Sequence, residues 1–124
     1  MKILIIEDEP AMRELMQKSL LQERYMVETA DGYNTALDKI GVYEYDCILL
    51  DINLPGMSGI DLLRIIRGSS FFATVPIIVF STSDNSGDIQ VALESGASEF
   101  RTKPLGYREL VNSLKLLHTK YINT

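Results

Sequence analysis

The feature that most constrains the fold is a set of short apolar runs without polar alternation. The clearest are ILII (3–6), CILLD (47–51) and VPIIVFS (75–81). Successive side chains of a strand point to opposite faces of its sheet, so a strand that is apolar throughout is covered on both faces. We therefore expect a parallel sheet with helices on both sides, and weaker strands over 25–30 and 98–102.

Helical patterns alternate with these runs. PAMRELMQKSLL (10–21) has apolar residues at helical spacing, and either Asp8 or Glu9 is the predicted N-cap. Further helices are predicted over 35–40, ending near Gly41, over 60–68, closed by Gly68, over 86–96, with Gly96 as the stop, and over 105–121. The result is five β-α units without a repeat or linker, which predicts an α/β protein with a single domain over residues 1–124.

Composition excludes several classes of function. Twelve basic residues against 17 acidic ones give a net charge of -5, which disfavours direct contact with nucleic acid. The single cysteine, Cys47, excludes an internal disulfide and an all-cysteine metal site, and we expect it to be a small buried apolar residue. No apolar run approaches membrane-spanning length and no signal peptide is evident, so we expect a cytoplasmic protein without a membrane partner.

Acidic and polar residues follow the predicted strands, and the carboxyl ends of parallel strands share one edge of a sheet. In chain order they are Glu7 and Asp8, Asp51, Ser81 and Thr82, and Lys103. Carboxylates that crowd together repel one another, and a hard divalent cation such as Mg²⁺ (or Mn²⁺) relieves this repulsion. The sequence therefore predicts a metal site beside Asp51.

A metal beside Asp51 suggests phosphoryl chemistry, because a carboxylate can attack phosphorus and form an aspartyl phosphate. Such a transfer needs mainly positioning and neutralisation of charge. The Lys103 ammonium can pair with one phosphoryl oxygen, and the Ser81 hydroxyl can donate a hydrogen bond to another.

These residues resemble the receiver domain of bacterial two-component response regulators, including the chemotaxis regulators, over essentially the whole chain. The motifs that carry the resemblance are Glu7-Asp8, Asp51 within ILLDINLPGMSG, Ser81 after PIIVF, and Lys103-Pro104. The resemblance implies a flavodoxin-like doubly wound fold whose five parallel strands have the order 2-1-3-4-5.

The resemblance also implies a chemical role for each residue. Asp51 would accept a phosphoryl group from a phosphohistidine on a histidine kinase or phosphotransfer protein, and Lys103 would pair with it. The implied ligands of Mg²⁺ are Asp8, Asp51, the backbone carbonyl of Asn53 and, largely through water, Glu7.

Two further residues would make the domain a switch. Ser81 would move toward the phosphoryl group and Phe100 would turn inward, which changes the face formed by 86–96, 98–102 and 105–121. This face would signal to a partner or output domain, and it would form a homodimer on phosphorylation. Thr82 and Arg101 depart from the common pattern, since a smaller residue than Thr is usual at the first position and Arg101 puts a charge on the signalling face.

Three other functions agree less well with the residues present. A Mg²⁺-dependent phosphohydrolase with Asp51 as nucleophile often has an acid two positions later, where this chain has Asn53. A flavin module needs a phosphate-cradling loop where this chain has EDEP, and a docking module that is never phosphorylated would not need Asp51, Lys103 and Ser81. We therefore expect a switch that catalyses only its own phosphorylation and dephosphorylation, either alone or within a longer regulator.

Simpler structural roles remain open for single residues. Glu7 and Asp8 could interact favourably with the dipole of the following helix, and Asp51 could cap the turn that follows it. Phe100 could be an ordinary core aromatic. The FFA segment at 71–73 could be either a loop anchor or a contact patch.

Overall fold

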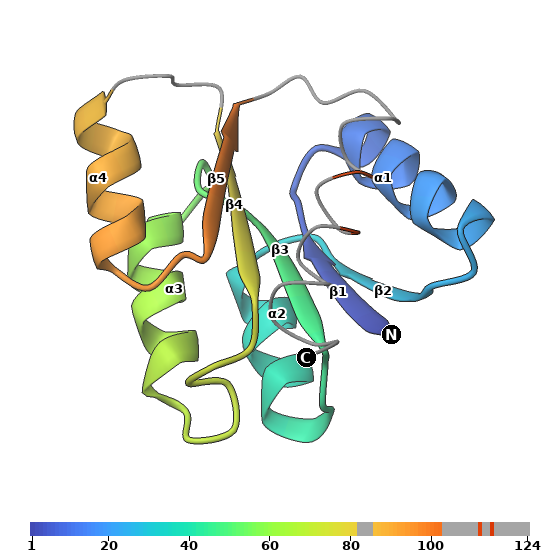
Figure 1. Ribbon diagram of the computed structural model, residues 1–124, viewed down its shortest axis with the longest axis horizontal. Helices are drawn as coiled ribbons and strands as arrows, with labels where there is room; N and C mark the ends of the chain where they lie inside the picture. The colour runs from blue at the N-terminus through green and yellow to red at the C-terminus, as the bar shows by residue number, and fades with distance from the viewer. Residues whose placement is uncertain (82–85, 103–111, 113–114, 116–124) are drawn as a thin grey trace.

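The protein contains one parallel sheet with the strand order β2-β1-β3-β4-β5 (Figure 1), as the resemblance implied. The computed structural model describes residues 1–81, 86–102, 112 and 115. The strands are β1 (Lys2–Ile6), β2 (Met26–Ala30), β3 (Cys47–Asp51), β4 (Ile77–Ser81) and β5 (Glu99–Thr102). All four pairings are parallel, so the carboxyl ends of the strands meet at one edge.

The described helices are α1 (Pro10–Gln22), α2 (Tyr33–Val42), α3 (Gly59–Gly68) and α4 (Ser86–Glu94). Gly96 follows α4 with a φ of +117°, which confirms its predicted role as the stop. The predicted closing helix over 105–121, with Pro104 before it, lies outside the described residues apart from two isolated positions.

The predicted start of α1 and the predicted end of α3 are confirmed. Glu9 occupies the N-cap of α1, but its side chain makes no capping hydrogen bond, and Pro10 begins the helix. Gly68 is the last helical residue of α3, and Ser69 follows it with extended backbone.

Each face of the sheet has its own apolar core, because the pleat sends alternate side chains to opposite sides. One core joins Leu4, Ile6, Ile48, Leu50, Ile77 and Val79 to α2, α3 and α4 through Ala36, Leu62, Leu63, Ile66 and Ala92. The other joins Ile3, Ile5, Cys47, Leu49, Ile78 and Phe80 to Met16 and Leu20 of α1. The continuous apolar runs are thus explained by burial from both sides.

Cys47 is completely buried at the start of β3. Burial raises the pKa of its thiol to about 12, so the thiol stays protonated at neutral pH. This agrees with the prediction of a small apolar residue.

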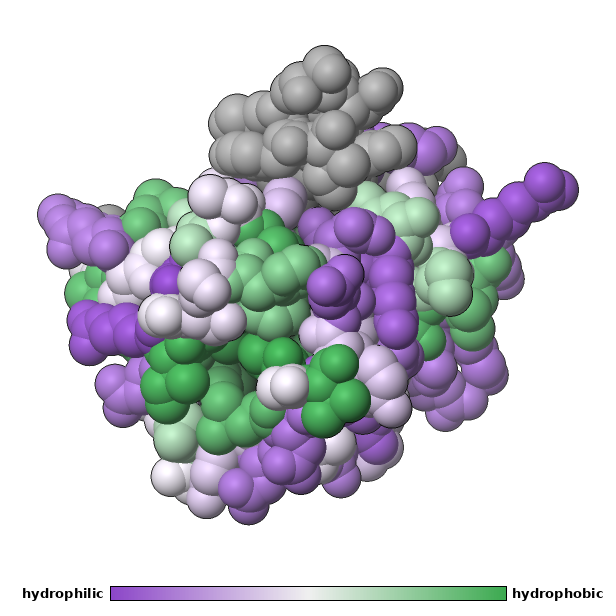
Figure 2. All heavy atoms as spheres, turned by 90° about the horizontal axis from the view of Figure 1, so that it is seen from below, coloured by the Kyte–Doolittle hydropathy of each residue, from purple (hydrophilic) through white to green (hydrophobic). Residues whose placement is uncertain are grey.

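Apolar side chains also gather at the edge where the strands begin (Figure 2). A pocket of about 330 Å³ lies there, lined by residues 40–44 at the C-terminal end of α2 and just beyond it, and by Ser69, Phe71 and Phe72 after α3. Phe72 is buried and stacks edge-on against Phe71, which is 47% exposed. The FFA segment therefore contains both an anchor and an exposed aromatic.

Within the described ranges, no helix has the length and apolar character needed to cross a bilayer.

Arg67, in the last turn of α3, joins the two loops that precede β4 and β5. Its guanidinium donates hydrogen bonds to the backbone carbonyls of Gly96 (2.8 Å) and Phe72 (3.0 Å). It also donates to the carbonyl of Val75 and to the hydroxyl of Ser98. One side chain therefore donates to three backbone carbonyls in these two loops.

A second polar cluster surrounds Glu28 on β2. Its carboxylate accepts a hydrogen bond from the Tyr45 hydroxyl (3.0 Å) and lies 2.9 Å from the Lys2 ammonium and 3.7 Å from that of Lys39. The hydrogen bond from Lys2 holds the pKa of Glu28 below its ordinary value, although burial opposes this effect. Burial raises the pKa of Tyr45, and the bond to Glu28 adds to the rise.

We predict that Arg67→Met lowers the free energy of unfolding by about 2–3 kcal/mol, because the apolar stem remains while several backbone carbonyls lose their donor. Urea titration measures the change. Arg64→Met on the same helix is the matched control, since Arg64 is exposed, and it should change stability by less than about 0.5 kcal/mol. Equal losses in both variants would contradict the role of Arg67.

We also predict that Glu28 makes stability depend on pH. Its pKa is lower in the folded chain than its ordinary 4.5, so its contribution is present above that value and is lost as pH falls through the folded pKa. Glu28→Gln should cost roughly 0.5–1 kcal/mol at pH 7 and reduce the loss of stability on acidification. Urea unfolding near pH 7 and pH 3 tests this. Lys2→Met should have the same effect, and an unchanged pH dependence in both variants would refute the prediction.

Candidate functional site

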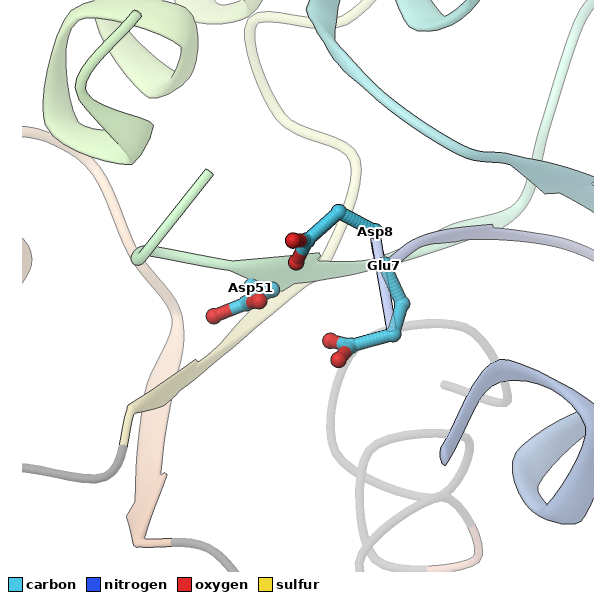
Figure 3. A group of neighbouring side chains, drawn as sticks. All are labelled: Glu7, Asp8 and Asp51. Atoms are coloured by element: carbon cyan, nitrogen blue, oxygen red, sulfur yellow. The ribbon is translucent and has the colours of Figure 1, made fainter. Parts of the chain in front are cut away.

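Three acidic side chains meet at the edge where the strands end. Asp51 is the last residue of β3, and Glu7 directly follows β1. The register pairs Ile6 with Leu50, so the residues one step later, Glu7 and Asp51, lie side by side on adjacent strands. Asp8 comes from the loop that leads into α1, and Figure 3 shows the three carboxylates close together.

The geometry of this cluster suits a small hard cation. One carboxylate oxygen from each of Glu7, Asp8 and Asp51 lies within 4.8 Å of the others. Glu7 and Asp51 are buried and Asp8 is half-buried, so the cluster has one open side. Magnesium prefers such oxygen ligands and keeps several waters, which an open side can hold. The residues present therefore fit a Mg²⁺ ion.

The loop after β3 fixes the position of Asp51. The backbone N–H of Asn53 donates a hydrogen bond to Asp51 Oδ1 (2.9 Å), and the N–H of Ile52 bonds to the carbonyl of Phe80 (2.9 Å). The loop then closes on itself, because the N–H of Gly59 bonds to the carbonyl of Ile52 (3.0 Å). Asp51 thus accepts a bond from its own turn, as one of the simpler interpretations allowed, and still faces the acidic pair. The N-cap of α3 is Ser58, which accepts a bond from the Ile60 N–H.

Ser81, at the end of β4, is buried and linked to the same loop. Its hydroxyl donates a hydrogen bond to the side-chain oxygen of Asn53 (3.1 Å). Asn53 therefore contacts Asp51 through its backbone and Ser81 through its side chain, so it connects the ends of two neighbouring strands.

Phe100 and Arg101 lie on β5, two strands away from Asp51. Phe100 pairs with Val79 and packs, half-buried, against the core that faces α3 and α4. Arg101 lies 3.5 Å from the Glu99 carboxylate and also donates to the carbonyl of Phe100. Its charge is thus engaged on its own strand.

The structure brings together Glu7, Asp8, Asp51, Asn53 and Ser81 as the sequence predicted. Lys103 and Thr82 lie outside the described residues. Sequence reasoning missed Arg13, whose guanidinium donates to the backbone carbonyls of Glu7 (3.0 Å) and Asp8 (3.3 Å). Its place in the first turn of α1, soon after the acids, was the available signal, but spacing alone does not show where a long side chain bends.

The sequence matches the response regulator receiver domain family over residues 3–115. Among curated proteins it is 37% identical over 125 residues to the alkaline phosphatase synthesis transcriptional regulatory protein SphR of Synechococcus elongatus, covering 94% of this chain and 48% of that protein. The chain spans about half the length of the curated relatives it matches.

Solved structures of a response regulator and of a receiver domain are also similar to this chain. The chemotaxis response regulator CheY4 of Vibrio cholerae superposes with a TM-score of 0.90 at 28% identity, covering 94% of this chain and 97% of that one. The receiver domain of the sensor histidine kinase PA1611 from Pseudomonas aeruginosa superposes with a TM-score of 0.85 at 26% identity, covering 99% and 98% of the two chains. That structure has a magnesium ion coordinated in its active site cleft.

We predict that Gly59→Ala disturbs the loop behind Asp51. A Cβ at position 59 would lie 2.3 Å from the Cα of Ile52 and 2.6 Å from its carbonyl oxygen, and backbone cannot rotate away as a side chain can. We expect a loss of about 1–3 kcal/mol in the free energy of unfolding, measured by chemical denaturation.

The matched control is Gly68→Ala at the other end of α3, where a Cβ meets nothing within 4 Å. It should stabilise the protein by about 0.5–1 kcal/mol, because alanine loses less backbone entropy than glycine in a helix. Equal effects of the two substitutions would show that the close approach at Gly59 is unimportant.

Proposed function

Since this chain belongs to the response regulator receiver domain family, we propose that it is a two-component switch in which Asp51 accepts a phosphoryl group. One observation carries the proposal. Asp51 lies at the carboxyl end of β3 with the Glu7 and Asp8 carboxylates beside it, as a nucleophile with an adjacent cation site requires. The proposed donor is the phosphohistidine of a histidine kinase or phosphotransfer protein.

In the proposed transfer, an Asp51 carboxylate oxygen forms a bond to phosphorus while the bond from phosphorus to the donor's imidazole nitrogen breaks. The electron pair of that bond stays on the imidazole nitrogen, and the product is an aspartyl phosphate. The Asn53 N–H holds Oδ1 of Asp51 and so restricts rotation of the carboxylate before the attack.

The acidic cluster supports a Mg²⁺ ion as the cofactor. Asp8, Asp51 and the Asn53 carbonyl would hold it directly, with Glu7 acting largely through water. When bound, the ion supplies positive charge against the carboxylates and the incoming phosphoryl oxygens. Lys103 would pair with another of those oxygens, a role that rests on the sequence.

Ser81 and Phe100 are the proposed switch residues. To donate to a phosphoryl oxygen, the Ser81 hydroxyl must exchange its bond to the Asn53 side chain for one to the phosphate. The half-buried Phe100 would then turn further inward, which alters the surface of α4 and β5. The two arrangements of Ser81 and Phe100 are states in equilibrium. Phosphorylation can shift that equilibrium only by the difference between the free energies with which the two states interact with the phosphoryl group.

We further propose that the face of α4, β5 and the predicted closing helix transmits the signal, either to a partner or to an output domain. Homodimer formation on phosphorylation through this face is part of the proposal. Transcriptional output is supported by relatives such as SphR, which are named as transcriptional regulators and are about twice as long as this chain. The only reactions proposed for the domain are its own phosphorylation and dephosphorylation.

We predict that acetyl phosphate with Mg²⁺ adds about 80 daltons to the wild-type chain, the mass of one phosphoryl group bound as aspartyl phosphate. Intact-mass spectrometry at neutral pH measures the gain. Asp51→Asn should show none, because an amide does not attack phosphorus.

Two controls test whether the mass gain depends on the position of the carboxylate and on Mg²⁺. Asp46→Asn removes a carboxylate at the opposite end of β3, where Asp46 accepts a bond from the Lys2 N–H, and it should leave the mass gain intact. Omitting Mg²⁺ and adding EDTA should abolish the gain in wild type. An unmodified wild-type chain, or a gain that persists in Asp51→Asn, would overturn the proposed function.

A further inference from the structure

Among the three acids, Asp8 receives the least support from the sheet. Asp51 lies within β3, and the backbone N–H of Glu7 continues the ladder by bonding to the carbonyl of Ala30 (3.0 Å). Asp8 lies in the loop before α1, and the N-cap of that helix makes no side-chain capping bond that would order the loop locally. Another contact must therefore fix the direction of the Asp8 carboxylate.

Arg13 provides that contact. Its Nη1 donates to the carbonyl of Glu7 (3.0 Å) and to the carbonyl of Asp8 (3.3 Å). These carbonyls belong to the two peptide planes that flank the Asp8 Cα. A peptide unit is planar, so holding both carbonyls restricts the φ and ψ angles of Asp8 and with them the direction of its Cα–Cβ bond.

Arg13 is itself held by α1. Its backbone N–H bonds to the carbonyl of Glu9 (3.0 Å), and the side chain is half-buried. A guanidinium presents its donors in a rigid fork and stays charged at all working pH values, so it can hold two carbonyls at once more firmly than an ammonium can.

We propose that Arg13 is a positioning residue for the cation site, acting through the backbone on the Asp8 carboxylate. The inference rests on the proposed function, because it assumes that the cluster of Glu7, Asp8 and Asp51 binds Mg²⁺. Arg13 contacts no carboxylate through these bonds, so it orients a ligand without being one.

A purely electrostatic role predicts the opposite result. A positive charge close to the acids repels Mg²⁺, so removing it would tighten binding of the ion. Loss of positioning instead weakens binding, because Asp8 must be ordered when the ion arrives. The sign of the change in Mg²⁺ affinity therefore separates the two explanations.

The experiment is a Mg²⁺ titration of the whole chain without a phosphoryl donor, followed by amide NMR shifts and repeated by calorimetry. We expect Arg13→Met to weaken Mg²⁺ binding about tenfold, as is typical when a group that supports a metal ligand is removed. Arg13→Lys retains the charge but replaces the planar guanidinium with a freely rotating ammonium, and it should fall between Arg13→Met and wild type. Lys18→Met, which removes a positive charge from an exposed position on the same helix, should bind Mg²⁺ as wild type does.

Thermal unfolding in EDTA, compared with unfolding in excess Mg²⁺, separates positioning from general stability. Positioning predicts that Arg13→Met reduces the stabilisation produced by Mg²⁺, whatever its stability in EDTA. Equal or tighter Mg²⁺ binding in Arg13→Met, with wild type binding normally, would overturn the inference and leave the proposed function intact. Failure of wild type to bind Mg²⁺, with no difference from Asp51→Asn, would instead count against the proposed cation site.

Discussion

The structure depends on holding three mutually repelling carboxylates at the end of a buried parallel sheet. Glu7 and Asp51 are almost fully buried, and burial of charge is unfavourable without compensation. The two apolar cores keep β1 and β3 in the register that sets these acids side by side. Their carboxylate oxygens lie close enough together to hold a metal ion.

Around these acids, backbone hydrogen bonds determine where each side chain points. Asn53 contacts Asp51 through its N–H and Ser81 through its side chain, so hydrogen bonds connect Asp51, the proposed phosphoacceptor, to β4. Arg13 holds the peptide planes on both sides of Asp8 in a similar way. The site is therefore preorganised on its β1 and β3 sides. In the proposed switch, the Ser81 hydroxyl on β4 would exchange its bond to Asn53 for one to the phosphoryl group.

The opposite edge of the sheet has a separate structural role. The Arg67 bonds to loop carbonyls and the apolar pocket near Phe71 both lie where strands begin. A five-residue strand separates them from the acids by roughly 17 Å at the usual rise per residue. Contacts at this edge can therefore set the stability of the domain without entering the geometry of the site.

The sequence alone determined the strands, most helices and the set of residues at the acidic edge, because apolar periodicity and strand ends are local properties of the chain. The strand order came from family resemblance, since periodicity does not show which strands pair. Only the tertiary structure decided that the Glu9 side chain makes no capping bond at the N-cap of α1, that Gly59 must lack a side chain beside Ile52, and that Arg13 and Arg67 bind backbone carbonyls. These features depend on which groups folding brings within reach of one another, and a polar side chain carries no local pattern that identifies its partner.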